Sequence, residues 1–327
     1  MEPYEVNEIL FNNQVIVYLL SEILLYALLL IAFLLTVTLL KSWDFSHFTQ
    51  RQFRLENRSY LVMSIVLFTL MLKMLLLPYF VYTIDSLSDL VPGAMCAAGV
   101  IKANGYGTML LTLKIVLLFL SGLWMGINQL DMKTTEYRYM RAKSWFFFFL
   151  FVGLSVEMAW DILYFTQIQT TAPVQCCSVI FGQVGGTNSL PFGLDTFKLM
   201  VLFYLLFALL FLSVFTQNAP LSVFVAPLFL FISYYAVVYV FGTYIYELPT
   251  HKCPFCMLQD HYHYVGYLVW GFLLFGLFFV LKGAMFSYVF QEKSEHINRV
   301  ALGLLSIFVL LCSGYVLIYY LKNGVFL

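Results

Sequence analysis

The fold is decided by residues 14–40, QVIVYLLSEILLYALLLIAFLLTVTLL, in which Glu22 is the only charged residue. About 20 apolar residues in a helix cross the roughly 30 Å hydrocarbon core of a bilayer. This stretch is therefore long enough to span a membrane, and its extra length allows it to tilt or to project beyond the bilayer. The residues before it contain three glutamates and no lysine or arginine. That charge is wrong for a signal peptide, so we expect a mature helix.

Seven further apolar stretches of similar length follow along the chain. Together they predict an all-α polytopic membrane protein, with eight transmembrane helices in one membrane domain over residues 1–327. The predicted spans cover approximately residues 14–40, 60–82, 108–130, 144–166, 194–216, 221–246, 264–290 and 300–321. Proline lacks the backbone N–H that a helix interior needs, so Pro78 is expected to kink or end the second span.

The composition excludes several classes of protein. Of the 327 residues, 62% are hydrophobic and 10% are charged, and the mean hydropathy is +0.89. A soluble domain carries about 25% charged residues, so a water-facing surface cannot be built from this chain. The 17 basic and 17 acidic residues leave no excess positive charge for nucleic acid. Membrane lipid is therefore the expected surrounding, and no nucleic-acid partner is expected.

Basic residues divide unevenly between the two sets of loops. One set carries Lys41, Arg51, Arg54, Arg58, Lys133, Arg138, Arg141, Lys143, Lys293 and Arg299, and the other set carries Lys102, Lys252 and Lys322. Because lysine and arginine accumulate in cytoplasmic loops, the first set is predicted to be cytoplasmic and both termini to lie outside. The outer loops contain no Asn-x-Ser/Thr sequence. We therefore expect a bacterial inner membrane protein with these loops in the periplasm.

Five of the six cysteines fall in the predicted outer loops, where disulfides form and persist. They are Cys96, Cys176, Cys177, Cys253 and Cys256, whereas Cys312 lies within the last span. The CxxC pair Cys253 and Cys256 is expected at the start of a helix, where the thiol pKa falls and the thiolate is favoured. Such a thiolate attacks a disulfide and its neighbour resolves the product, which indicates a thiol–disulfide oxidoreductase. An inert disulfide that pins the loop is the alternative.

The segment 253–259, CPFCMLQ, resembles the C-x-x-C-x-x-Q-R stretch of the DsbB-type membrane disulfide-generating proteins. Its placement is also similar to the CxxC of vitamin K epoxide reductase relatives. The resemblance implies that Cys253 and Cys256 pass electrons to a quinone near Gln259. It also implies that Cys96, with Cys176 or Cys177, exchanges with a soluble periplasmic thiol protein. The sequence departs from the family pattern in having Asp260 after the glutamine and in having eight spans where these families have four.

The same segments also contain the ligands that soft metal ions prefer. Thiolate and thioether groups favour Cu(I), and thiolate with imidazole suits zinc. The candidate ligands are Met95, Cys96, Cys176, Cys177, His251, Cys253, Cys256, Met257, His261 and His263. A copper- or zinc-binding protein for metal handling or metal-centre assembly is therefore a second hypothesis. A structural subunit of a larger membrane complex is a third, and whether the chain is an enzyme stays open.

Six ionisable residues fall inside the predicted spans and, by the topology above, in their outer halves. They are Glu22, Lys73, Lys114, Glu157, Asp161 and Lys198. Ionisable groups inside a membrane are costly, so they are either paired or functional. Glu22, Lys73, Glu157 and Asp161 are expected to form a proton path or structural ion pairs, and Lys114 and Lys198 are expected to be structural. No comparable groups are expected near the cytoplasmic ends.

Overall fold

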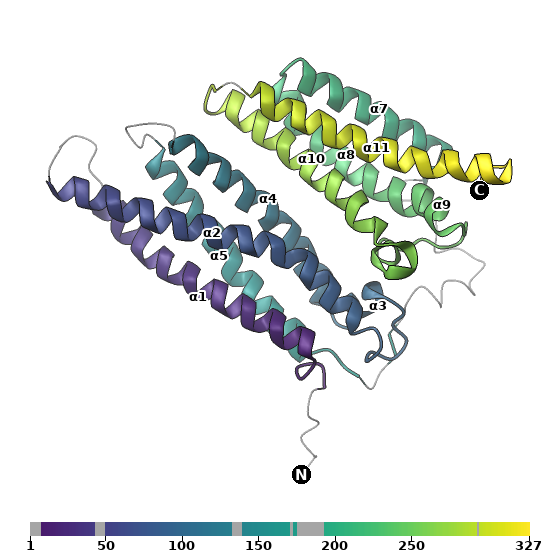
Figure 1. Cartoon of the computed structure of the whole chain (residues 1–327), viewed down its shortest axis with the longest axis horizontal. Coiled ribbons are helices and arrows are strands. Elements are labelled where there is room, and N and C mark those ends of the chain that lie inside the picture. The colour runs from purple at the N-terminus through teal and green to yellow at the C-terminus, as the bar shows by residue number, and fades with distance from the viewer. Residues whose placement is uncertain (1–7, 43–49, 133–138, 171–172, 175–192, 293) are drawn as a thin grey trace, which may run out of the picture. The chain divides into compact units, whose positions relative to one another are not determined.

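The computed structural model describes the chain except for residues 1–7, 43–49, 133–138, 171–172, 175–192 and 293 (Figure 1). The described residues form helices and connecting loops and contain no strand. Among them are eight helices long and apolar enough to cross a membrane, which confirms the predicted all-α, multi-pass class. The side of the membrane on which each loop lies stays a prediction from the basic residues.

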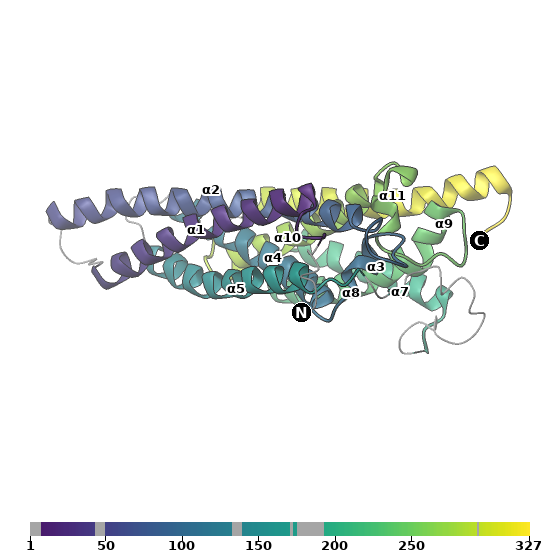
Figure 2. The same ribbon diagram turned by 90° about the horizontal axis from the view of Figure 1, so that it is seen from below.

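The chain divides into two compact units, and the first comprises residues 1–92 and 100–174. Its long helices are α1 (Asn13–Ser42), α2 (Gln50–Ser86), α4 (Gly107–Asp131) and α5 (Met140–Thr166). Helix α1 packs against α2 and α5, and α4 packs against the same two helices; Figure 2 shows this unit from below. Apolar side chains pack between these helices, and Leu29, Leu70 and Phe147 are among those that are fully buried.

The second unit comprises residues 93–99 and 175–327. Its helices are α7 (Thr196–Phe215), α8 (Ala219–Ala236), η2 (Val237–Phe241), α9 (Gly242–Tyr246), η3 (Cys256–Leu258), η4 (Asp260–Tyr262), α10 (Val265–Tyr288) and α11 (Glu295–Asn323). Helix α8 continues through the π-helical turn η2 into α9, so these three elements form one span. Four buried phenylalanine rings form an aromatic core with centroids 5.1–6.3 Å apart: Phe203, Phe229, Phe241 and Phe308. The short helix α3 (Ala97–Ile101) contains the point in the chain where the second unit's segment 93–99 ends and the first unit's segment 100–174 begins.

Each of the eight predicted spans falls on one of the eight apolar helices of the described residues, and the largest difference lies at the start of α2. Of the two effects predicted for Pro78, a kink or an end of the helix, the second is wrong, because α2 continues through Pro78 to Ser86. Proline is tolerated inside membrane helices when neighbouring groups satisfy the backbone that it frees. One turn further on, the Thr83 hydroxyl donates to the Tyr79 carbonyl at 2.9 Å and adds a hydrogen bond to the helix.

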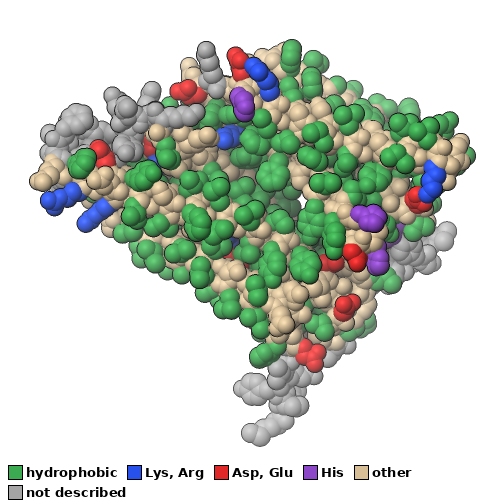
Figure 3. Space-filling view, in the orientation of Figure 1, with side chains coloured by type: hydrophobic (Ala, Val, Ile, Leu, Met, Phe, Trp, Pro, Cys, Tyr) green, Lys and Arg blue, Asp and Glu red, His purple; other side chains and the backbone are tan. Residues whose placement is uncertain are grey.

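The surface of the helices is apolar. Hydrophobic side chains are spread over the whole face drawn in Figure 3, and charged side chains are few on it. Leu75, Phe215 and Leu310 are each about 70% exposed. Such side chains cost free energy in water but none in hydrocarbon, so this surface fits contact with lipid tails.

Candidate functional site

Three cysteines meet in the second unit, and we call Cys96, Cys253 and Cys256 the three-thiol cluster. The sulfur atoms of Cys96 and Cys253 lie 3.7 Å apart, and all three sulfurs lie within 4.8 Å of one another. The residues are 0%, 1% and 7% exposed, respectively. Cys96 reaches the cluster because the segment Gly93–Gly99 packs with the second unit, although the chain on either side of it belongs to the first. Two loops far apart in sequence thus supply one buried group of thiols.

Hydrogen bonds from two helices hold the CxxC loop in place. The buried Tyr246, at the end of α9, donates its hydroxyl proton to the Cys253 carbonyl at 2.5 Å and accepts the Met257 N–H at 3.1 Å. From α10, the Trp270 indole N–H donates to the Pro254 carbonyl at 3.2 Å. The backbone on both sides of the two cysteines is therefore fixed by rigid elements. A site held in this way is preorganised for a ligand.

Close packing against α10 adds a further constraint. Gly266 lies in the first turn of α10, and a Cβ atom built there would lie 2.5 Å from Cγ of Met257 and 2.9 Å from its carbonyl carbon. The Met257 side chain is fully buried against this helix. Glycine at 266 is thus required for the loop to approach α10 so closely.

The predicted position of the CxxC pair at the start of an α-helix is wrong. Cys256 begins the three-residue 3-10 helix η3, and the next α-helix, α10, begins at Val265. Two consecutive residues with positive φ, His263 at 53° and Tyr264 at 56°, interrupt the helical path before α10. The structure therefore lacks the aligned peptide dipoles that would favour a thiolate at the CxxC.

The other predicted site residues of this region lie around the cluster. The Gln259 amide donates to the Met95 carbonyl at 3.5 Å, a long contact that joins the two cysteine loops, and the Met95 side chain is exposed. The His251 ring packs on Tyr246, with centroids 4.2 Å apart. His261 and His263 are exposed, and His261 lies 3.8 Å from Asp260. Cys176 and Cys177 lie outside the described residues.

Tyr262, in the segment that follows the CxxC, keeps its proton. Burial, followed by the charge that Cys256 carries as a thiolate, raises the pKa of Tyr262 above its ordinary value. Its ring lies 4.8 Å from that of Tyr246 in an edge-to-face contact. The phenol is therefore neutral at physiological pH.

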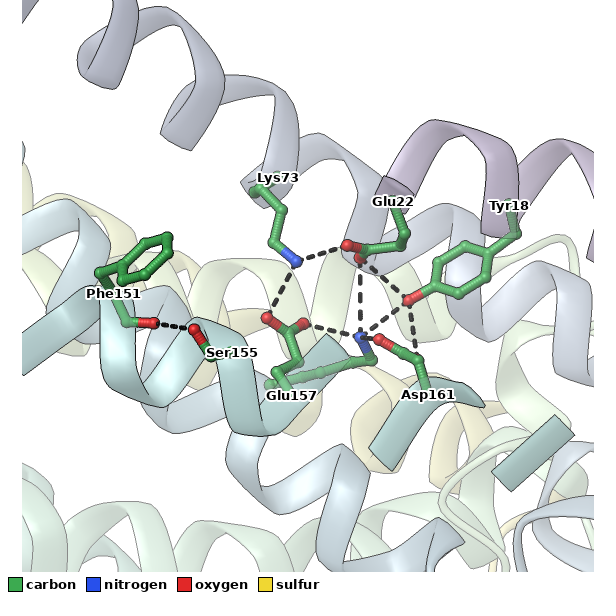
Figure 4. A network of polar contacts seen from close by, with 8 residues as sticks. Tyr18, Glu22, Lys73, Phe151, Ser155, Glu157 and Asp161 are labelled. Atoms are coloured by element: carbon green, nitrogen blue, oxygen red, sulfur yellow. Dashed lines mark hydrogen bonds and ion pairs between the residues drawn. The ribbon is translucent and has the colours of Figure 1, made fainter. Parts of the chain in front are cut away.

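A second group of reactive side chains lies inside the first unit, and we call it the charge cluster. It consists of Glu22 from α1, Lys73 from α2, Lys114 from α4, and Glu157 and Asp161 from α5, together with Tyr18 from α1 (Figure 4). Lys73 pairs with Glu22 at 2.5 Å and with Glu157 at 2.9 Å. Lys114 pairs with Glu157 at 2.6 Å and with Asp161 at 2.7 Å.

The charge cluster brings together all four residues predicted as a proton path or ion pairs. Lys114, predicted to be structural, lies at its centre, whereas Lys198 is exposed on α7 in the other unit. Tyr18 was not predicted. Its hydroxyl lies 3.1 Å from Glu22 and 3.0 Å from Asp161. The spacing of four residues between Tyr18 and Glu22, which matches that between Glu157 and Asp161, is the signal in the sequence that points to it.

The far ends of α4 and α5 carry a further buried ion pair. Lys143 Nζ lies 2.6 Å from an oxygen of Asp131, and both side chains are at most 3% exposed. Lys143 also donates to Asn128, and the other oxygen of Asp131 accepts the Tyr139 N–H at 2.8 Å. The prediction of no comparable groups at these ends is therefore wrong. Lys143 belongs to helix α5 and to the protein interior rather than to a loop.

Comparisons with known proteins leave the function to be argued from this geometry. No family model, no curated protein and no solved structure matches the chain. The resemblance of residues 253–259 to the DsbB-type stretch accordingly stays a prediction.

Proposed function

We propose that this multi-pass membrane protein binds a soft metal ion at the three-thiol cluster, for metal handling or metal-centre assembly. The observation that carries the proposal is the mutual approach of three buried sulfur atoms to within 4.8 Å. Thiolates bind metal ions of this kind at about 2.3 Å, so three of them around one ion lie about 4 Å apart. The separation of 3.7 Å between Cys96 and Cys253 is close to that value.

Cu(I) fits this group of ligands better than zinc. Structural zinc sites take four protein ligands, whereas Cu(I) is held by two or three soft sulfur atoms. The described residues place three thiols in the cluster, and two of the predicted histidine ligands, His261 and His263, are exposed. Burial of the cluster also limits access of water, which favours the reduced ion.

The test is a Cu(I) titration of the purified full chain under anaerobic, reducing conditions against a chromophoric Cu(I) chelator. We expect one equivalent to bind, and Cys96→Ser, Cys253→Ser and Cys256→Ser each to weaken binding by about 100-fold or more, because each removes a direct ligand. Cys312→Ser is the matched control, since Cys312 is an equally buried thiol within α11. X-ray absorption should detect three sulfur neighbours at about 2.3 Å. Equal Cu(I) binding by wild type and the three variants would rule the proposal out.

Thiol–disulfide exchange is the second candidate, and the 3.7 Å approach of Cys96 to Cys253 favours it. In this reaction a quinone oxidises the Cys253–Cys256 dithiol, taking two electrons and two protons to become a quinol. The Cys96 thiolate then attacks Sγ of Cys253, so that a Cys96–Cys253 bond forms and the Cys256 thiolate leaves. The thiolate of a periplasmic protein, or of another cysteine of this chain, would then attack Sγ of Cys96. A new disulfide with Cys96 would form, and Cys253 would leave as a thiolate.

Mass mapping of cysteine states on the same sample separates the candidates. Under the exchange hypothesis, adding a quinone to reduced, metal-free protein yields one equivalent of quinol and a disulfide from Cys253 to Cys256 or to Cys96, and Cys253→Ser abolishes both products. Thiols that stay reduced in the presence of quinone contradict this hypothesis. A disulfide that resists both reductant and quinone would favour the structural-subunit hypothesis instead.

A further inference from the structure

The charge cluster contains three carboxylic acids and two amines inside a membrane-spanning unit. Glu22, Glu157 and Asp161 are at most 4% exposed, and Lys73 and Lys114 have side chains at most 8% exposed. If all five were ionised, the buried group would carry a net charge of −1. A single uncompensated charge in a low-dielectric interior is costly, and a carboxylate usually removes the cost by taking up a proton.

The hydrogen bonds also leave room for one more proton. Glu157 Oε1 accepts a hydrogen bond from Lys114 at 2.6 Å, and Oε2 lies 2.9 Å from the Lys73 ammonium group in an ion pair. Both oxygens therefore face a cation, which favours the ionised form of Glu157. Lys73 also covers one oxygen of Glu22, and Lys114 also covers one oxygen of Asp161. The two remaining oxygens, Oε1 of Glu22 and Oδ1 of Asp161, accept no hydrogen bond from either lysine, and Oε1 of Glu22 has only a longer ion contact of 3.7 Å with Lys114.

Both of these oxygens face the same hydroxyl group. The Tyr18 hydroxyl lies 3.1 Å from Glu22 Oε1 and 3.0 Å from Asp161 Oδ1, and its oxygen accepts a hydrogen bond from the Lys114 ammonium group at 2.7 Å. A phenol has one proton, so it can donate to one of the two carboxyl groups but not to both. The other carboxyl group makes its hydrogen bond with Tyr18 only if it is itself protonated and donates to the phenolic oxygen.

We infer that the charge cluster is a proton-binding site in which Glu22 and Asp161 share one proton across the Tyr18 hydroxyl. With the proton on Asp161, Asp161 donates to Tyr18 and Tyr18 donates to Glu22; with the proton on Glu22, both bonds reverse. The two states differ by the movement of two protons over short distances. One added proton thus removes the net charge and completes the hydrogen bonds at the same time.

A small cavity beside this site is large enough to hold a water molecule. It has a volume of about 20 Å³, and its polar lining residues are Tyr18, Glu22, Lys73, Lys114, Ser121 and Glu157. A single water molecule needs roughly 10–15 Å³ and two to four polar partners, so a water fits here and can carry a proton to or from Glu22. Another buried tyrosine, Tyr164 on α5, donates its hydroxyl hydrogen bond to the Val100 carbonyl at 3.0 Å. This hydroxyl group is therefore bonded to the backbone and does not take the place of Tyr18 in the charge cluster. The inference is independent of the metal proposed at the three-thiol cluster.

Infrared spectroscopy of the full chain in lipid tests for the proton directly. We expect wild-type protein at neutral pH to show a buried carboxylic acid C=O band that shifts in D₂O. Asp161→Asn and Glu22→Gln should each abolish the band, because each variant leaves two carboxylates opposite two ammonium groups. Glu295→Gln, a change at an exposed carboxyl group, should leave the band unchanged. Wild-type protein without such a band would overturn the inference.

Thermal unfolding gives a second, independent test. An amide has the shape and the hydrogen bonds of a protonated carboxyl group, so Asp161→Asn or Glu22→Gln should each shift the melting temperature by less than about 2 °C. Glu157→Gln removes a fully paired carboxylate and should lower it by about 6 °C or more, as should the double variant Glu22→Gln/Asp161→Asn. A purely structural ion network predicts similar losses for all three single variants. That result would overturn the shared proton.

Discussion

The phenolic oxygen of Tyr246 lies 2.5 Å from the carbonyl oxygen of Cys253, and this contact ties the end of α9 to the first cysteine of the CxxC. The same oxygen accepts the N–H of Met257, one residue beyond the second cysteine. One side chain therefore holds the backbone at both ends of the CxxC loop. The geometry of the three-thiol cluster depends on a residue that contributes no ligand.

Replacement of Tyr246 should weaken this site without removing a thiol. Tyr246→Phe leaves the Cys253 carbonyl and the Met257 N–H without this partner, which costs about 1–3 kcal/mol for a buried group. We expect Cu(I) affinity to fall about 10-fold or more, as for other residues that orient metal ligands. Tyr244→Phe on the same helix is the control, because its hydroxyl makes a long 3.5 Å contact with Leu327. Equal affinities in the two variants would show that Tyr246 does not position the thiols.

Gly266 tests whether the loop has to approach α10 closely. Gly266→Ala places a methyl group 2.5 Å from Met257 Cγ, so the loop has to move. We expect a loss of about 1–3 kcal/mol in the free energy of unfolding and faster alkylation of Cys253 and Cys256. Gly271→Ala, one to two turns along α10, meets no atom within 4 Å and should stabilise the helix by up to about 1 kcal/mol. Identical alkylation rates in the two variants would contradict the close packing.

Most of the fold could be predicted because the length of an apolar run is a local property of the sequence. Eight such runs predicted eight helices. The error at Pro78 arose because the cost of a proline depends on what surrounds the helix, which the sequence of that helix does not contain. The division into two units was not predicted for a similar reason. It depends on packing such as that of Gly93–Gly99, which joins the second unit from between two helices of the first.

The residues of the candidate sites could be predicted where their type is rare in an apolar span, and were missed where it is common. Charged residues are unusual in apolar spans, so Glu22, Glu157 and Asp161 stood out, and predicted topology grouped Cys96 with the CxxC. Tyr18 did not stand out, because the chain contains 23 tyrosines. Lys143 was assigned to a cytoplasmic loop because a basic residue near a helix end usually lies there. Its burial depends on Asp131, which comes from the neighbouring helix.

The predicted orientation can be tested by labelling with a membrane-impermeant maleimide in intact cells. If both termini face outward, Phe11→Cys and Asn323→Cys should be labelled before lysis, and Gln291→Cys only after it. All three positions are exposed in the structure, so labelling reports the side of the membrane rather than burial. The variants are made in a chain with Cys176 and Cys177 replaced by serine, and wild type with the same replacements gives the background. Labelling of Gln291→Cys in intact cells would reverse the topology and place the three-thiol cluster in the cytoplasm.

In the Asp131–Lys143 pair, each side chain should matter mainly because it neutralises the buried charge of the other. We therefore expect the loss of one charge to cost more stability than the loss of both. Lys143→Met removes the lysine from its ion pair with the fully buried Asp131, and removing one partner of a buried pair costs about 3–5 kcal/mol. The double variant Asp131→Asn/Lys143→Met removes both charges and still offers an oxygen to the Tyr139 N–H. We therefore expect thermal unfolding in detergent to show a large loss in the single variant and recovery of most of it in the double variant. Arg299→Met, which breaks the exposed pair with Glu295, should change stability by at most about 0.5 kcal/mol. Additive losses in the double variant would mean that the two charges act independently, and the 2.6 Å ion pair would then not be what holds these ends of α4 and α5 together.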